Sequence, residues 1–184
     1  MRVLGLDPGT VRTGWGVVDE ADRRLQYVAG GTIHAGGNIA DRLATIFAHT
    51  QTILSDFAPQ CVSLEKTFVG ENVQSAFRLG EARGAILVAT ARAGVRVYEY
   101  TPAEIKLAVA GHGRAAKEQM QLMVARLLRR RELAAADEAD ALGAAICHLH
   151  SQGFATLAAE AVPTRRSQLP RMWQRRGGAR RARG

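Results

Sequence analysis

Cysteine is scarce in this sequence, and clusters of soft metal ligands are missing. The chain of 184 residues has two cysteines, Cys61 and Cys147, and both lie among apolar neighbours. Such thiols are typical of buried residues in a reducing compartment, and they do not indicate a disulfide framework. The segment Cys-His-Leu-His at residues 147–150 does not have the spacing of a closed zinc site on one helix. We therefore expect reduced thiols and no zinc centre.

Long apolar runs are also absent. No stretch approaches the length of a membrane span. The first residues, MRVLGLDPGT, are interrupted by Asp7 and Pro8 too early to form a signal peptide. The hydrophobic content of 47% nevertheless suits one globular domain with a substantial core. We expect a cytoplasmic protein with no membrane partner.

Acidic residues are missing from the C-terminal end, and this absence produces the net charge of +8. Eight of the 25 lysines and arginines follow Pro163, whereas residues 1–162 carry 17 basic and 17 acidic side chains. The low apolar content of the arginine-rich segment is typical of disorder. We predict a folded domain over residues 1–160 and a disordered tail over residues 161–184. The tail either keeps the protein soluble or attracts phosphates, and we favour the second role.

Short apolar runs and helical periodicities alternate along the predicted domain. Three strand-like runs come first, and the following patterns predict helix, strand, helix, strand and three more helices. This order predicts an α/β fold with a five-stranded mixed sheet, made of an antiparallel meander plus parallel strands and flanked by helices. The first strand and the strand at residues 61–65 should pair near the centre. Gly14 and Gly16 would allow a ligand to approach the second strand closely.

Two of the predicted strands are apolar until a terminal acid. Asp7 closes the first strand and Glu65 closes the strand CVSLE. Asp137 and Asp140 lie three residues apart at the start of an alanine-rich helix, where like charges on one face repel each other. Each acid has an ordinary explanation as a turn residue, a strand-edge ion pair or a helix cap. Occurring together in this topology, they indicate one site at the carboxyl ends of the strands.

Such a site contains only oxygen ligands, which suits Mg²⁺ or Mn²⁺ better than Zn²⁺. Two such ions roughly 4 Å apart can hold the attacking and leaving oxygens of a phosphodiester displacement. Cations would also compensate the mutual repulsion of the crowded acids. We therefore predict two Mg²⁺ or Mn²⁺ ions per active site and metal-dependent hydrolysis of a phosphodiester.

Four segments resemble the successive motifs of the RuvC family, the bacterial Holliday-junction resolvases. They are GLDPGTVRTGWGV, LEKTFVGENVQSAFRLGEARG, IKLAVAGHGRAAKEQ and ADEADALGAAICHLH. The resemblance extends from residue 2 to about residue 155 and is specific, because four separate motifs match in order. It implies a ribonuclease-H-like fold and a homodimer that cuts two opposing strands of four-way-junction DNA, leaving 5′-phosphate and 3′-hydroxyl ends. It also implies a role in recombination and repair beside the RuvA–RuvB branch-migration complex.

The same resemblance implies roles for individual residues. The catalytic and metal-binding carboxylates of the family match Asp7, Glu65, Asp137 and Asp140. Its important basic residues match Lys106 and Lys117, and we expect Lys117 to stabilise charge on the phosphoryl oxygens. The aromatic residue that contacts unstacked bases at the junction matches Phe68. Arg78 is a further DNA-binding candidate.

Other interpretations of these residues remain open. A loop aromatic folded onto the core explains Phe68 equally well, and both lysines can be ordinary surface residues. A related nuclease acting on RNA or damaged DNA would use the same carboxylates. A non-catalytic nucleic-acid-binding module is disfavoured because uncompensated acids repel phosphate. An ATPase would need a second phosphate-binding loop, which the sequence lacks.

The predicted homodimer has a candidate interface in the long helix expected over residues 73–93. Its small residues would allow close approach of a second copy: Ala82, Gly84 and Ala85. A two-fold enzyme suits a two-fold junction, because symmetry places both active sites on equivalent strands. The alternative is that this helix packs only against its own sheet.

Overall fold

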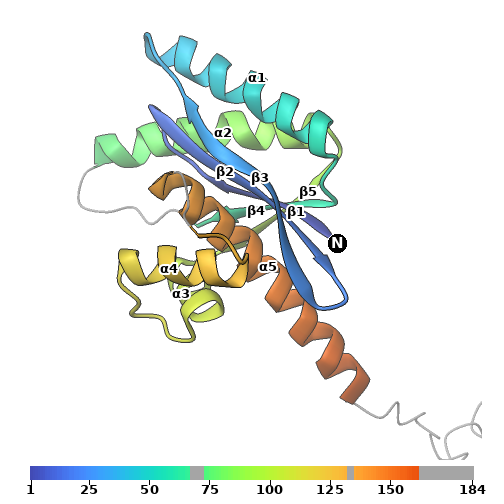
Figure 1. Cartoon of the computed structure of the whole chain (residues 1–184). Helices are drawn as coiled ribbons and strands as arrows, with labels where there is room; N and C mark the ends of the chain where they lie inside the picture. Colours follow the sequence, from blue (N-terminus) through green and yellow to red (C-terminus); the bar gives the residue numbers. More distant parts are fainter. Residues whose placement is uncertain (67–72, 132–134, 162–184) are drawn as a thin grey trace, which may run out of the picture.

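The computed structural model describes residues 1–66, 73–131 and 135–161. Its elements follow the predicted order, and they are β1 (Arg2–Asp7), β2 (Arg12–Ala21), β3 (Arg24–His34), α1 (Ile39–Phe57), β4 (Cys61–Glu65), α2 (Val73–Arg92), β5 (Arg96–Tyr100), α3 (Pro102–Ala110), α4 (Lys117–Leu127) and α5 (Ala136–Ala161) (Figure 1). Within the described part of the chain, no helix has the length and apolar character needed to cross a membrane. Phe68 and most of the predicted tail lie outside the described residues.

The strands form one sheet in the order β3-β2-β1-β4-β5. Strands β1, β2 and β3 make an antiparallel meander, whereas β4 runs parallel to both β1 and β5. The prediction of a five-stranded mixed sheet flanked by helices is confirmed. The predicted central pair is also confirmed, since β1 and β4 lie side by side. Asp7 and Glu65 therefore end two neighbouring parallel strands at the same edge of the sheet.

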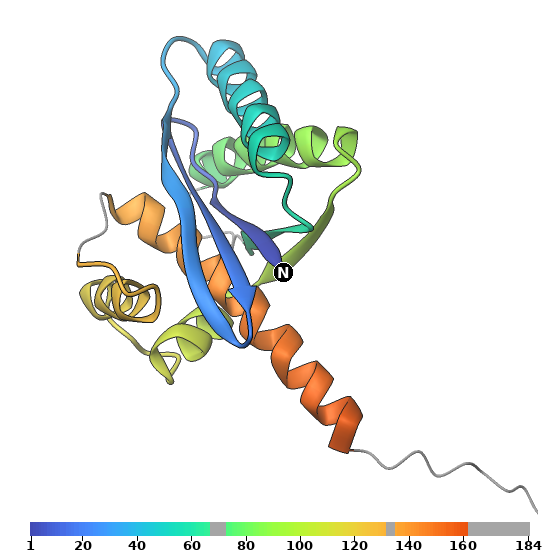
Figure 2. The same cartoon turned by 45° about the vertical axis from the view of Figure 1, so that its right-hand side comes forward.

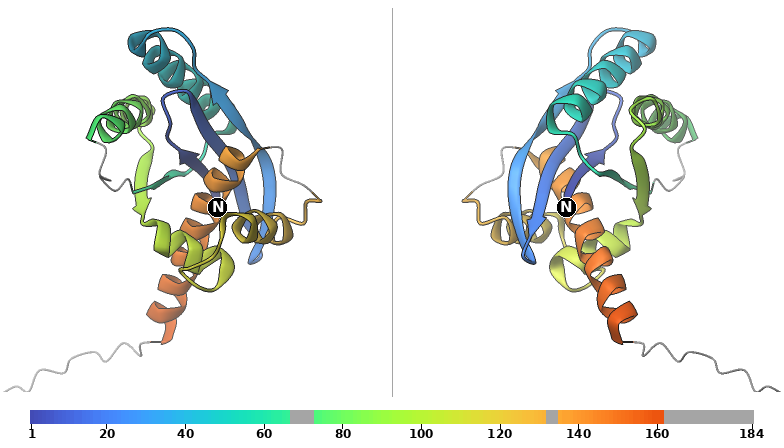
Figure 3. Two further views of the ribbon diagram at one scale, coloured as in Figure 1. Left: turned by 90° about the vertical axis from the view of Figure 1, so that its left-hand side faces the viewer. Right: turned by 90° about the vertical axis from the view of Figure 1, so that its right-hand side faces the viewer.

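Helices cover both faces of the sheet, α1 and α2 on one side and α3, α4 and α5 on the other (Figures 1 and 3). Successive side chains of a strand point to opposite faces. Accordingly, Val3 and Cys61 pack in the core with α5, while Leu4 and Val62 pack in the core on the other face. Continuing this alternation along β1 and β4 turns Asp7 and Glu65 towards α5.

Helix α5 crosses the sheet at very close range, and its C-terminal part extends beyond the sheet (Figure 2). A Cβ atom on Gly5 would lie 1.9 Å from the carbonyl oxygen of Ala141, and one on Gly14 would lie 1.9 Å from that of Asp137. A Cβ on Gly16 would meet the Leu142 side chain at 2.4 Å. The expectation that Gly14 and Gly16 leave room for a ligand is therefore wrong: they leave room for α5.

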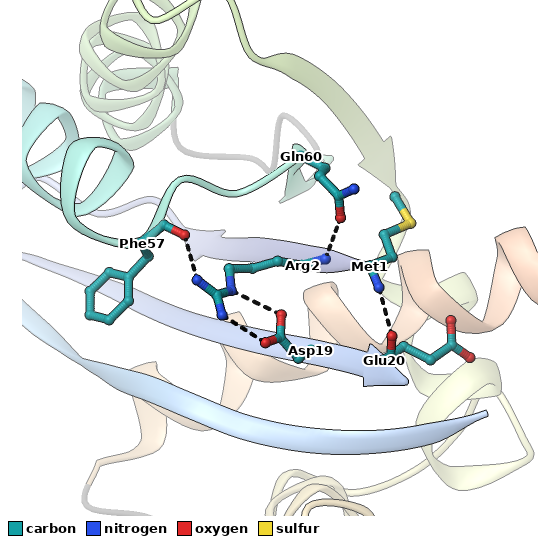
Figure 4. A network of polar contacts seen from close by, with 6 residues as sticks. All are labelled: Met1, Arg2, Asp19, Glu20, Phe57 and Gln60. Carbon is teal, nitrogen blue, oxygen red and sulfur yellow. Dashed lines mark hydrogen bonds and ion pairs between the residues drawn. The ribbon is translucent and has the colours of Figure 1, made fainter. Parts of the chain in front are cut away.

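The opposite end of β1 is held by a polar network (Figure 4). The Arg2 guanidinium donates to both carboxylate oxygens of Asp19, at 2.9 and 2.8 Å, and to the carbonyl oxygen of Phe57 at 2.9 Å. The backbone N–H of Arg2 donates to Oε1 of Gln60 at 2.6 Å. These bonds join β1 to β2 and to the segment that follows α1. They fix the amino-terminal end of β1, whereas Asp7 lies at the carboxyl end of the same strand.

Candidate active site

The four predicted carboxylates come from two strands and one helix. Asp7 ends β1, Glu65 ends β4, and Asp137 and Asp140 project from the beginning of α5. Burial raises the pKa of Asp7 to about 7, and the negative charges of Asp140, Glu65 and Asp137 add to this effect. Because Asp7 is electrostatically coupled to all three other acids, the structure brings the predicted residues into one cluster with Asp7 at its centre.

Glu65 shares this environment. Burial raises its pKa, and Asp140 raises it further, while the positive charges of Lys106 and Lys117 oppose the shift. Lys106 lies in α3 and Lys117 is the first residue of α4. Both lysines predicted from the family resemblance are therefore close enough for their charges to act on Glu65.

The start of α5 differs from the helix-cap interpretation. The helix begins at Ala136, so Asp137 lies within its first turn and is not the N-cap residue. Asp137 and Asp140 are three residues apart and project from the same side of the helix. The closeness of α5 to Gly14 then places this side at the end of β1, because Gly14 is the partner of Asp7 in the β1–β2 ladder.

Two cations pair with these aspartates. Nζ of Lys117 lies 3.0 Å from Oδ2 of Asp140, and Nε of Arg12 lies 3.2 Å from Oδ2 of Asp137. The hydrogen bond and charge of Asp140 raise the pKa of Lys117. Arg12 was not singled out from the sequence. Its position at the start of β2, the strand that pairs with β1, was the available signal.

The residues present fit a hard divalent cation. In the described ranges, no three Asp, Glu, His or Cys side chains already surround one metal position. Asp137 and Asp140 instead form ion pairs with Arg12 and Lys117. The side chains of these two basic residues are 61% and 55% exposed. The donor set is nevertheless all carboxylate, which matches Mg²⁺ or Mn²⁺. A bound cation would compete with Arg12 and Lys117 for the same oxygens.

Arg78 lies outside this cluster, on α2. It lines two neighbouring hollows, one with Gly9 and Thr10 from the loop after Asp7 and the other with Thr10 and the start of α1. Its side chain is 57% exposed and lies 3.5 Å from Glu81. Arg78 therefore lies beside the loop that follows Asp7.

Glu138, the third acid of this helix start, is separated from the cluster. It is 1% exposed, and its Oε1 lies 2.9 Å from Nη1 of Arg130. The sequence patterns assigned no role to Glu138 and did not identify Arg130 as its partner. A spacing of three residues places Asp137 and Asp140 on one side of the helix, whereas Glu138, one of the two residues between them, points to another side.

Comparisons with known proteins agree with this geometry. Residues 3–148 match the family model described as crossover junction endodeoxyribonuclease RuvC. The chain is 46% identical over 167 residues to the RuvC of Pelobacter propionicus, covering 90% of this chain and 95% of that protein. It is 47% identical over 163 residues to the RuvC of Ralstonia pickettii, covering 88% of this chain and 89% of that protein. The solved structure of Thermus thermophilus RuvC in complex with a Holliday junction substrate superposes with a TM-score of 0.80 and 35% identity, covering 85% of this chain and 97% of that chain.

Proposed function

This chain belongs to the RuvC family of crossover junction endodeoxyribonucleases, and on that premise we propose that it resolves Holliday junctions by hydrolysing a phosphodiester at the carboxylate cluster. The observation that carries the proposal is the meeting of half-buried Asp7 with Glu65, Asp137 and Asp140 where β1, β4 and the start of α5 come together. Four acids packed together repel phosphate, unless divalent cations bind between them and the DNA. The cluster therefore suits a metal-dependent nuclease better than a passive DNA-binding surface.

Each acid has a distinct place in the proposed mechanism. Asp7, central among the four, would bind both of two Mg²⁺ or Mn²⁺ ions, Glu65 would bind one, and Asp140 the other with Asp137 in support. When bound, the ions would supply Lewis acidity and positive charge to the phosphodiester and the attacking water. Lys117 would then be released from Asp140 and stabilise charge on the phosphoryl oxygens. Lys106 and Arg78 would hold the DNA backbone, and Phe68 would contact unstacked bases.

The raised pKa of Asp7 makes the proposed site sensitive to pH. At neutral pH the metal-free carboxyl is partly protonated, because its pKa is about 7. A cation binds the ionised form, so protons and metal compete for the same group. Cleavage should therefore rise with pH through this range, and a higher metal concentration should move the rise to lower pH.

The proposed homodimer uses one face of α2. Phe77 is 70% exposed and Val88 is 55% exposed, and between them Gly80 and Gly84 have open space in front of their backbone. Such a stripe of apolar and small residues at helical spacing supports contact with the same helix of a second copy. Of the small residues named from the sequence, only Gly84 belongs to it, because Ala82 is buried in its own core and Ala85 packs against that core.

The remaining parts of the proposal follow from the family. Two active sites in a two-fold dimer would cut opposing strands symmetrically and leave 5′-phosphate and 3′-hydroxyl ends. The RuvA–RuvB complex is the expected partner, and the bacterial cytoplasm, which contains the chromosome, is the expected location. The tail after residue 161 would add non-specific attraction to DNA phosphates.

The decisive experiment compares a synthetic four-way junction with a linear duplex of the same sequence, each incubated with Mg²⁺, Mn²⁺ or EDTA. We expect paired nicks in the junction, metal dependence and no cutting of the duplex. Religation of the products by DNA ligase would establish the predicted ends. Junction binding without cleavage in either metal would contradict the enzymatic proposal and identify a binding module. Equal cutting of junction and duplex would indicate a nuclease without junction specificity.

A further inference from the structure

Glu138 is a buried acid held by two residues from other parts of the fold. Its Oε1 accepts hydrogen bonds from Nη1 of Arg130 at 2.9 Å and from the hydroxyl of Tyr27 at 3.2 Å. The guanidinium of Arg130 also lies over the Tyr27 ring, 3.9 Å from its centroid. Among the described residues, Oε2 of Glu138 has no hydrogen-bond partner. The whole attachment therefore depends on one carboxylate oxygen.

These contacts join three elements at the beginning of α5. Tyr27 belongs to β3, and Arg130 follows the end of α4 with its N–H bonded to the carbonyl oxygen of Ala125 at 2.8 Å. Glu138 packs closely against β3 at Gly30: a Cβ there would lie 2.7 Å from Oε1 of Glu138, so that the side chain would have to shift. The first turn of α5 thus approaches the sheet closely at Gly14, where there is no Cβ, and is attached over β3 by Glu138.

The position of Glu138 in the helix connects this attachment to the active site. Successive residues of an α-helix are rotated by about 100°. Asp137 and Asp140 therefore share one side, while Glu138 points away from it onto β3. A rotation or lift of the first turn that released Glu138 would move both aspartates relative to Asp7.

We propose that Arg130 and Tyr27 clamp Glu138, and that this clamp sets the divalent-cation affinity of the active site by fixing Asp137 and Asp140 relative to Asp7. Arg130, Tyr27 and Glu138 are positioning residues, since none of them belongs to the carboxylate cluster. The inference rests on the proposed function for the identity of the metal site. It goes beyond that function because it assigns control of metal affinity to side chains on the far side of the helix.

The physical reason is that metal affinity depends on how well the ligands are held in place before the ion binds. Residues that orient metal ligands typically change affinity by about 10–100-fold when they are replaced. Arg130 is the only described side chain that forms an ion pair with Glu138. Without it, a charge buried to 99% (exposed fraction 1%) would gain more by moving towards water than by staying over β3.

The test measures metal binding directly. Mn²⁺ is titrated into the full-length, DNA-free protein, and unbound Mn²⁺ is followed by electron paramagnetic resonance. We expect Arg130→Met to weaken Mn²⁺ binding by about tenfold, and to shift the Mn²⁺ concentration for half-maximal junction cleavage by the same factor. The rate at saturating Mn²⁺ should stay within about threefold of the wild type, because the ligands themselves are intact.

Two further variants and a control keep the test independent of folding. Glu138→Gln removes the charge while keeping the shape and one acceptor oxygen, and Tyr27→Phe removes only the hydroxyl. Both should weaken Mn²⁺ binding less than Arg130→Met, in the order Glu138→Gln and then Tyr27→Phe. Arg126→Met removes an equal charge from an exposed position near the end of α4. It should leave Mn²⁺ affinity within about twofold.

The outcomes separate the clamp from the proposed function. If Arg130→Met and Glu138→Gln melt at lower temperature but bind Mn²⁺ as Arg126→Met does, the residues are merely structural and the inference is overturned. If Arg130→Met does not fold, Glu138→Gln decides by the same criterion. If the wild type binds Mn²⁺ but cuts no junction, the proposed function fails, while the clamp is still judged by the Mn²⁺ affinities. Absence of Mn²⁺ binding by the wild type would overturn both.

Discussion

The two ends of strand β1 shift the pKa of an acidic side chain in opposite directions. At the amino-terminal end, the hydrogen bonds and charge of Arg2 lower the pKa of Asp19, which lies opposite on β2. At the carboxyl end, burial and three neighbouring acids raise the pKa of Asp7 to about 7. The fold therefore stabilises the ionised form of Asp19 and destabilises the ionised form of Asp7.

The two ends differ in how completely basic side chains neutralise the acidic charge. Arg2 meets Asp19 through two hydrogen bonds, so charge and geometry are matched within the protein itself. At the other end, Arg12 and Lys117 are the only described side chains that form ion pairs with the four carboxylates. A protein region that crowds like charges gives up stability, and such regions concentrate at functional sites. The imbalance at Asp7 therefore marks the end of the strand where a positively charged ligand belongs.

Replacing Asp7, the central acid of the cluster, should have the largest effect on junction cleavage. We expect Asp7→Asn to lower junction cleavage by about 1000-fold or more, since losing several kcal/mol of metal-dependent stabilisation costs a factor of ten per 1.36 kcal/mol. Junction binding in EDTA should persist, because the variant removes a charge that repels phosphate. Rates are measured at saturating Mn²⁺, and binding by gel shift. Cleavage above about one hundredth of the wild-type rate would remove Asp7 from its central role.

The same variant should stabilise the metal-free protein at high pH. The folded pKa of Asp7 is about 7 and its ordinary value is 3.8, so the folded state holds the proton more tightly. The contribution of Asp7 to stability is therefore complete below about pH 4 and is lost as pH rises through 7, a change of about 4 kcal/mol. Asn does not titrate, so Asp7→Asn should become the more stable protein towards pH 8.

Urea unfolding of both proteins in EDTA, at a series of pH values from 4 to 8, measures this difference. The wild type should lose stability relative to Asp7→Asn as pH rises. A difference that stays constant over the series would mean that Asp7 ionises as easily in the fold as in the unfolded chain, and the charge imbalance would then be absent.

The close approach of α5 can be broken at Gly14. In Gly14→Ala, the new Cβ would lie 1.9 Å from the carbonyl oxygen of Asp137, a backbone atom that cannot rotate away. We expect a loss of about 1–3 kcal/mol in the free energy of unfolding, together with weaker metal-dependent cleavage as α5 is displaced. Gly153→Ala on the same helix is the control, because a Cβ there has open space and alanine favours helix by up to about 1 kcal/mol. Equal stability of the two variants would contradict the close packing.

Sequence patterns were sufficient for the order of elements and for the placement of Asp7 and Glu65. Both follow from local rules, since an apolar strand ending in an acid places that acid at the sheet edge whatever the rest of the fold does. The central pairing of β1 with β4 also followed from topology. The sequence did not predict that α5 is the neighbour of Gly14 and Gly16. A glycine in a strand permits close approach without specifying which element approaches.

Long-range partners were the part that local patterns could not supply. Arg12 meets Asp137 across 125 positions of sequence, and Tyr27 meets Glu138 across 111. Such contacts depend on the angle at which α5 crosses the sheet, which no periodicity encodes. The proposed dimer face of α2 shows the same limit, because Ala82 and Gly84 are both small residues but lie on opposite sides of the helix.

The smallest effect is expected at the balanced end of β1. Asp19→Asn should lower stability by about 1 kcal/mol or less at pH 7, because the ion pair is partly exposed. That loss corresponds to a melting temperature lower by about 2–4 °C. Since the folded pKa of Asp19 lies below 3.8, the contribution of the pair is present above that value and disappears as pH falls through the folded pKa. The difference between wild type and variant should therefore shrink on acidification, opposite in direction to that for Asp7.

Junction cleavage should be unchanged, since the network at Arg2 touches no carboxylate of the cluster. A several-fold loss of cleavage with Asp19→Asn would mean that the two ends of β1 are mechanically coupled, and that the network in Figure 4 helps to set the position of Asp7.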